Sequence, residues 1–165
     1  MTNDSIKDKL AAQFPAVGEW EEQFGMLSFR APAEANLQVA EYLFHNADLQ
    51  FQFLTDLTAV HYPERKGEEL CVVALFHNLV ANVRVRMKVY VPVDKPDTFS
   101  LTPLFAGANW LEREAYDFFG VNFVGHPNLI RIMNVEEMDY FPMRKEYPME
   151  DPTRIDKDDE MFGRG

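Results

Sequence analysis

Two neighbouring segments of the chain carry the patterns of two different kinds of β-strand. Residues 83–91 (VRVRMKVYV) alternate apolar and polar side chains, which predicts a strand with one buried and one exposed face. Residues 70–76 (LCVVALF) are continuously apolar, as is typical of a strand covered on both faces. Only a few residues around HNLVAN separate them, too few for a crossover helix. We therefore expect the two strands to pair antiparallel, although the sequence does not fix the turn.

Helical patterns flank this pair of strands. Residues 4–14 have apolar side chains at helical spacing, with Asp4 or Ser5 available as a cap and Pro15 as a stop. The other expected elements are strands over 23–30 and 49–54 and helices over 32–46 and 110–119. The order of elements predicts an α+β fold, with helices covering a mainly antiparallel sheet.

Three cations share the polar face of the strand at 83–91: Arg84, Arg86 and Lys88. We favour the interpretation that they keep this face solvated and protect it against pairing with other sheets. An acidic partner surface is the alternative.

The charge of the chain limits what it can bind. The 165 residues carry a formal net charge of −11, which disfavours nucleic-acid backbones and anionic lipid headgroups. No apolar run approaches the roughly 20 residues that a membrane helix needs. The N-terminus lacks the pattern of a secretory signal and carries acids that transit peptides avoid, so we expect a cytoplasmic, bacterial protein.

The cysteine content argues against a cluster on this chain. An iron–sulfur cluster normally needs about four cysteine ligands, and the only cysteine, Cys71, lies in an apolar run. The four histidines are scattered without a metal-binding spacing. We expect no cofactor or metal on this chain.

The character of the chain changes near residue 140. We expect a compact domain over 1–140 and an extended acidic tail over 141–165, which has three prolines and no periodic apolar face. Such a tail is either disordered or laid along a partner. Within it, Arg144 and Lys145 lie between Pro142 and Pro148. They form either a solvated loop or a rigid strap whose Arg144 pairs with a partner's carboxylate.

The most informative segment is 108–131. Asn109 and Glu112 predict a helix start of the capping-box kind, and Gly120 predicts the left-handed residue that ends the helix. Aromatic side chains fall on several faces of this helix, so we expect it to be buried on several sides by another polypeptide.

The acids of this helix are candidate functional groups. Asp117 lies in the last turn, where the helix dipole disfavours a carboxylate, so we predict an ion pair with Arg131 or Arg113. Packing by charge pairs is favoured over catalysis, because Glu112 and Glu114 face different directions. A hydrolase that uses Asp117 and His126 is the alternative from another class.

The spacing of these residues is similar to one known family. The pattern resembles the thirty-kilodalton-type subunit of respiratory complex I over roughly residues 35–150. This chain departs from the family pattern at Ile130 and at Tyr140-Phe141. The matching residues are Glu112-Arg113-Glu114, Asp117, Phe118-Phe119-Gly120, His126-Pro127 and Arg131-Ile132, then Pro142, Arg144, Lys145, Tyr147 and Pro148, with Asp56-Leu57 and Tyr62-Pro63 upstream.

The resemblance implies a structural subunit of the peripheral arm of a proton-translocating NADH:quinone oxidoreductase. It would dock on the large quinone-site subunit, near the cluster-carrying subunits, on the cytoplasmic side of the bacterial inner membrane. FMN and iron–sulfur clusters would lie on partner subunits, and the isolated chain would be inactive. The same scaffold in a membrane-bound hydrogenase or a ferredoxin-driven dehydrogenase is the alternative.

Overall fold

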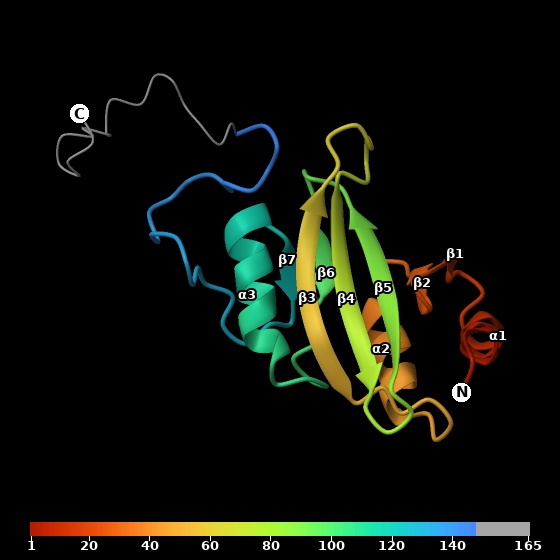
Figure 1. Ribbon diagram of the computed structural model, residues 1–165. Coiled ribbons are helices and arrows are strands. Elements are labelled where there is room, and N and C mark those ends of the chain that lie inside the picture. The colour runs from red at the N-terminus through yellow and green to blue at the C-terminus, as the bar shows by residue number, and fades with distance from the viewer. Residues whose placement is uncertain (148–165) are drawn as a thin grey trace, which may run out of the picture.

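A five-stranded sheet organises the protein (Figure 1). The computed structural model describes residues 1–147. The strand order is β1-β2-β5-β4-β3, and β2 pairs with β5 in parallel while the other three pairs are antiparallel. The predicted α+β class and the antiparallel pairing of β4 with β5 are thus confirmed. The strands are β1 (Gly18–Gln23), β2 (Met26–Arg30), β3 (Phe53–His61), β4 (Leu70–Asn78) and β5 (Val83–Val91).

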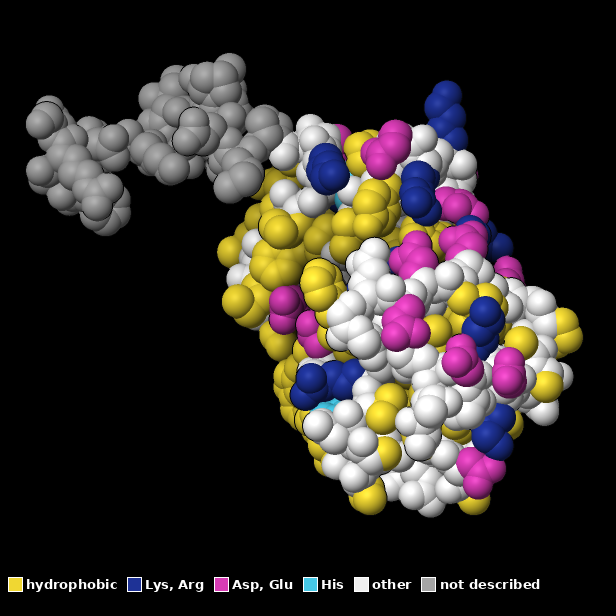
Figure 2. All heavy atoms as spheres, turned by 45° about the vertical axis from the view of Figure 1, so that its right-hand side comes forward, with side chains coloured by type: hydrophobic (Ala, Val, Ile, Leu, Met, Phe, Trp, Pro, Cys, Tyr) yellow, Lys and Arg dark blue, Asp and Glu magenta, His cyan; other side chains and the backbone are white. Residues whose placement is uncertain are grey.

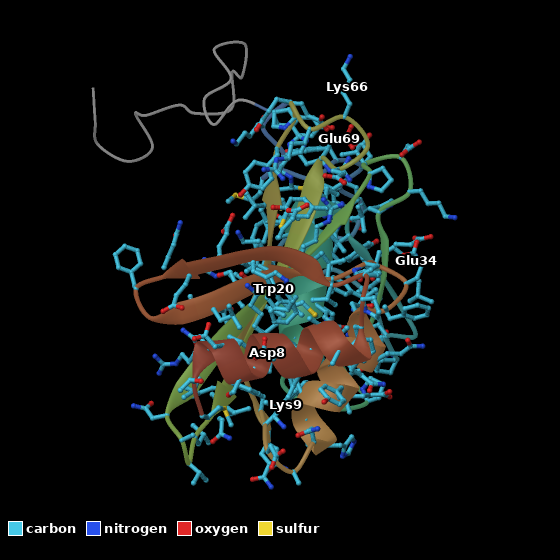
Figure 3. The ribbon with its side chains drawn as sticks, turned by 90° about the vertical axis from the view of Figure 1, so that its right-hand side faces the viewer. Asp8, Lys9, Trp20, Glu34, Lys66 and Glu69 are labelled. Carbon is cyan, nitrogen blue, oxygen red and sulfur yellow. The ribbon has the colours of Figure 1, made fainter. Side chains whose placement is uncertain are left out.

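Three helices and a small second sheet complete the described chain. Helix α2 (Asn36–His45) and the parallel pair β6 (Asp97–Phe99) and β7 (Asn122–Val124) lie behind the main sheet, and α3 (Ala108–Phe119) runs beside β3 (Figure 1). Helix α1 (Asn3–Gln13) crosses below the β1–β2 hairpin, with Trp20 between them (Figure 3). One face of the main sheet is therefore covered.

The core follows the alternation of the strands. On β5, Val85, Met87 and Val89 are at most 1% exposed and face the covered side. The same side takes the buried residues of α2, which are Asn36, Val39, Ala40 and Leu43.

The expected strand over 49–54 was wrong. Leu49 and Phe51 are fully buried, but they belong to a turn after α2, in which Leu49 and Gln50 donate backbone hydrogen bonds to the Asn46 carbonyl. The strand begins only at Phe53. Apolar alternation arose here because two side chains of a connection point into the core.

Two other boundaries differ from the prediction. The expected strand over 23–30 is two strands, joined by a turn at Phe24 and Gly25 that have positive φ values of 54° and 75°. Helix α1 is capped by Thr2, whose hydroxyl accepts from the Ser5 N–H, and not by Asp4 or Ser5.

The segment after β7 has no regular structure in residues 125–147 and wraps the end of α3 (Figure 1). Residues 148–165, most of the predicted tail, lie outside the described residues. The boundary at 140 stays a prediction.

Candidate functional site

A buried carboxylate at the end of α3 is the centre of the candidate site. The Asp117 side chain is 0% exposed, and its Oδ1 accepts from Arg131 Nη1 at 2.7 Å and Asn134 Nδ2 at 3.0 Å. Its Oδ2 accepts from the backbone N–H groups of Ile132, Met133 and Asn134 at 3.0, 2.7 and 2.9 Å. One carboxylate thus fixes the backbone of three successive residues.

The donors around Asp117 also determine its ionisation. Burial alone would raise the pKa of this carboxyl, but the N–H groups of Asn134 and Met133 and the guanidinium of Arg131 outweigh it. They hold the pKa of Asp117 well below its ordinary range. Asp117 is therefore a permanent anion near neutral pH and is suited to holding structure, not to exchanging protons.

Arg131 extends the fixed region along the chain. Besides pairing with the Asp117 carboxylate, its guanidinium donates to the backbone carbonyls of Met138 and Tyr140 at 2.7 and 2.9 Å. The predicted Asp117–Arg131 pair is thus confirmed. Arg113 instead donates to the carbonyls of Ile130 and Arg131, both at 3.2 Å, and supports the same loop from the other side.

Glu112 joins α3 to the chain before it. Its carboxyl is fully buried and accepts from the Ser100 hydroxyl and the Leu101 N–H, both at 2.6 Å. Burial raises the pKa of Glu112 to about 7 against these two hydrogen bonds. The predicted capping box at Asn109 was wrong, because the helix starts at Ala108 after the uncapped Gly107 and Glu112 is used elsewhere.

The end of α3 receives residues 141–147. Arg144 Nε donates to the Phe119 carbonyl at 2.7 Å, and the Met143 N–H donates to the Phe118 carbonyl at 3.1 Å. The Lys145 N–H donates to Nδ1 of the buried His61 at 3.0 Å. In these contacts Arg144 clamps its own helix and does not await a partner's carboxylate.

Phe141 and Gly120 make this contact close. The guanidinium carbons of Arg144 and Arg131 lie 4.5 and 5.2 Å from the centroid of the Phe141 ring. Gly120 has φ 77° as predicted, and a Cβ there would lie 2.5 Å from both Arg144 Nη2 and Phe141 Cε2. The glycine is needed for the turn and for the close approach together.

The other predicted residues lie apart from this site or at its rim. The His126 Nδ1 accepts from the Asn128 N–H, so its Nε2–H donates to the Asn109 carbonyl. Asp117 and His126 each use their polar atoms on other groups, which opposes the hydrolase hypothesis. Glu114, Pro127 and Lys145 are exposed, and Pro142 is half-buried.

Four residues of the site were missed by the sequence reasoning. Asn134, Ser100 and His61 carry hydrogen bonds to the site from loops and from β3. Nothing in the local pattern marks them. Phe141 did carry a signal, because it is one of the positions at which the chain departs from the family pattern.

Exposed apolar side chains gather on the loop that Asp117 holds. Met133, Val135 and Met143 are 68, 63 and 56% exposed, and Ile130 and Ile132 are 42 and 37% exposed. We call these five residues the apolar loop surface. Figure 2 shows hydrophobic side chains collected beside the start of the grey segment, whereas much of the rest of this view is polar. A hollow of about 340 Å³, lined by Tyr116, Leu129, Glu136 and Phe141 among others, adjoins it.

Trp110 is 56% exposed, whereas Phe119 is 9% exposed. The expectation that another polypeptide must bury α3 is therefore met in part by the chain itself. Within residues 1–147, no three His, Cys, Asp or Glu side chains are grouped as a metal site requires. No helix in the same range has the length and apolar character to cross a membrane.

Curated sequences similar to this chain share one kind of description. The C-type subunit of NADH-quinone oxidoreductase from Caulobacter sp. is 40% identical over 146 residues, covering 88% of this chain and 67% of that protein. A probable mitochondrial NADH-ubiquinone oxidoreductase 30.4 kDa subunit of Candida maltosa is 39% identical, covering 86% of this chain and 49% of that protein.

Solved structures agree on the fold. A trypsin-resistant fragment of Nqo5 superposes with a TM-score of 0.65 at 30% identity, covering 78% of this chain and 100% of that one. A chain of an archaeal membrane-bound sulfane sulfur reductase has a TM-score of 0.74, covers 88% of this chain and 85% of its own, and at 24% identity shows the fold alone. Residues 29–153 match the family described as respiratory-chain NADH dehydrogenase, 30 kDa subunit, and the chain belongs to that family.

Proposed function

We propose that this chain is a non-catalytic assembly subunit of the peripheral arm of a proton-translocating NADH:quinone oxidoreductase. It docks on the quinone-site subunit, near the subunits that carry FMN and iron–sulfur clusters, on the cytoplasmic side of the bacterial inner membrane. The family membership supports the complex, and the geometry at α3 supports the docking role.

The observation that carries the docking role is an exposed apolar loop fixed by buried charge. Three of its backbone N–H groups bind Asp117, and two of its carbonyls bind Arg131. Ordering a loop costs conformational free energy, and leaving its apolar side chains in water gains none back. Such an arrangement is useful when a partner covers the surface, because the ordering is complete before binding.

The ionisable groups of the site support structure better than chemistry. Asp117 accepts five hydrogen bonds through its carboxylate, and no nucleophilic serine or cysteine contacts it in the described chain. Cys71, the only cysteine, is 1% exposed on β4. A protein with this site can present a rigid surface, and we assign electron transfer to its partners.

The test of docking is to place charge on the apolar loop surface. Met133→Asp with Val135→Asp should leave the folded domain intact, because both side chains are largely exposed. It should reduce co-purification with the quinone-site subunit by at least roughly tenfold, since two buried apolar contacts are worth about 1.5–3 kcal/mol each. Co-purification at the level of the unmodified chain would contradict the proposal.

A matched control places the same two acids elsewhere. Phe99→Asp with Val124→Asp replaces exposed apolar side chains on the outer face of β6 and β7 and should leave co-purification unchanged. Deleting the gene for the chain should abolish NADH:quinone activity of the membranes. Retained activity in a clean deletion would remove this chain from the complex.

A further inference from the structure

The main sheet has a second face, which the described chain leaves uncovered. We call it the open sheet face. On β5, Arg84 is exposed and Arg86 and Lys88 are half-buried, opposite to the core-facing residues between them. Figure 1 views the sheet from this side, and no helix of residues 1–147 crosses in front of β4 and β5.

Two of the cations on this face have no ion-pair partner within residues 1–147. Lys88 Nζ contacts Glu21 at 2.8 Å, and Arg30 pairs with Glu19 and Glu68. Arg84 and Arg86 make no such contact in that range, although the chain as a whole carries a net charge of −11. In so acidic a protein, two unmatched arginines on one strand are a specific feature.

The position of β5 excludes edge protection, the interpretation that the sequence favoured for these cations. Charged side chains protect a strand at the edge of a sheet from pairing with another chain. However, β5 lies between β2 and β4, and its backbone is already paired on both sides. These arginines therefore have another role.

The arginines lie in cross-strand rows with apolar and aromatic neighbours. Arg84 faces His77, which pairs with the 46%-exposed Phe53, and Arg86 faces the half-buried Leu75. Asp56 is the exposed acid at the far end of the second row. Arginine with exposed aromatics is the composition that marks the centre of protein–protein interfaces.

The tip of the β1–β2 hairpin borders the open sheet face. Figure 3 shows the hairpin reaching out to the left, which is the side that faces the viewer in Figure 1. Its tip residue, Phe24, is fully exposed and has a positive φ of 54°. A non-glycine residue pays a conformational cost there, and an exposed phenyl ring returns none of it within this chain.

We propose that the open sheet face binds an acidic segment of a partner polypeptide, with Arg84 and Arg86 as its charged anchors. Carboxylates match two arginines set beside apolar side chains. Polyanions such as nucleic acid or an anionic lipid surface would meet the acids of the surrounding molecule. The proposal rests on the proposed function in that the chain works inside an assembly, and it gives the chain a second contact, separate from the apolar loop surface.

Reversal of the two charges tests the proposal. Arg84→Glu with Arg86→Glu is compared with Lys66→Glu plus Lys95→Glu, which changes the net charge equally. Lys66 and Lys95 form no ion pair within residues 1–147, and Figure 3 places Lys66 at the end of the β3–β4 connection. Each variant is expressed as a tagged chain in cells that lack the native gene, and its retention in the purified complex is measured against NaCl concentration.

We expect the Arg84 and Arg86 reversal to be lost at salt concentrations at which the unmodified chain and the lysine control stay bound, with affinity roughly tenfold lower. The Arg84→Gln plus Arg86→Gln variant should bind with a weaker salt dependence. A benzophenone amino acid at Phe53 should cross-link to a segment rich in Asp and Glu. All variants should keep the thermal midpoint of the unmodified chain.

Three results would overturn the proposal. These are equal retention of all variants, equal loss of both charge reversals, or a homodimer of the isolated chain that the arginine reversal dissociates. If the unmodified chain itself fails to co-purify with the complex, the proposed function falls instead, so the two failures are distinguishable.

Discussion

The two halves of the molecule are held together by different forces. The main sheet with α1 and α2 rests on apolar burial, with side chains such as Phe29, Val39 and Phe76 at 0% exposure. The half built from α3 and residues 100–147 rests on two carboxylates of one helix, Glu112 and Asp117, which are equally inaccessible.

The difference teaches how a loop without a core of its own becomes ordered. Apolar packing needs many side chains that face one another, and residues 125–147 place much of their apolar surface in water. A buried carboxylate can instead bind several backbone N–H groups from one position. The order of this half should therefore depend on single residues far more than that of the sheet.

Asp117→Asn should have the largest effect on this comparison. Every group around the carboxylate is a donor, so the amide NH₂ would face Arg131 or a backbone N–H. We expect a loss of about 3–5 kcal/mol in the free energy of unfolding, the cost of breaking a buried pair. Hydrogen exchange should show faster exchange across residues 130–140 than in β4.

Glu114→Gln is the control for that substitution, since it makes the same change in charge on an exposed face of the same helix. It should leave the unfolding midpoint and the exchange pattern unchanged. Equal effects of the two substitutions would mean that net charge, and not the bonds to Asp117, orders the loop.

Gly120→Ala should be the next most damaging change, with a loss of about 2–4 kcal/mol in the free energy of unfolding. The methyl group would combine an unfavourable positive φ with a collision against Arg144 and Phe141. Gly125→Ala separates the two causes, because Gly125 has φ 87° but nothing within 4 Å of its added Cβ. It should lose only about 1 kcal/mol in chemical denaturation, and equal losses would contradict the packing argument.

The two acids should give this half opposite responses to pH. Burial raises the pKa of Glu112 to about 7 from an ordinary 4.5, so the folded state holds a proton that the unfolded chain has released. The free energy of unfolding should therefore fall by about 1 kcal/mol between pH 6 and 8. The contribution of Asp117, whose pKa is lowered, is present above its ordinary value of 3.8 and is lost as the pH falls below it.

Glu112→Gln checks the first of these signs. The amide cannot ionise, so its denaturation midpoints should change less between pH 6 and 8 than those of the unmodified chain. A parallel pH dependence in both proteins would show that another group titrates. The Asp117 contribution is read from the acid side, as a loss of protection in residues 130–140 below about pH 4.

The sequence predicted what depends on short repeating patterns. The limits of β5 and the antiparallel partner of β4 follow from alternation and from a short connection, and Gly120 follows from the need for a left-handed residue. The Asp117–Arg131 pair was predicted as one of two alternatives, because the helix dipole requires a cation there.

The missed features depend on contacts between distant segments. Ser100 binds Glu112 and His61 binds Lys145 across loops that no periodicity describes. The strand predicted over 49–54 failed because alternation reports which side chains are buried, not whether the backbone is paired. The partner role considered for Arg144 came from its charge alone, whereas its burial follows from Phe141 folding beneath it.

Lys9→Gln should have the smallest effect and completes the comparison. Lys9 and Asp48 form an ion pair of 2.7 Å in the sheet half, the same distance as between Arg131 and Asp117. Their side chains are 37 and 69% exposed, against 8 and 0% for the buried pair, so water screens the attraction. The substitution should leave the denaturation midpoint unchanged in low and high salt. A loss comparable to that of Asp117→Asn would show that distance, not burial, decides what an ion pair contributes to this fold.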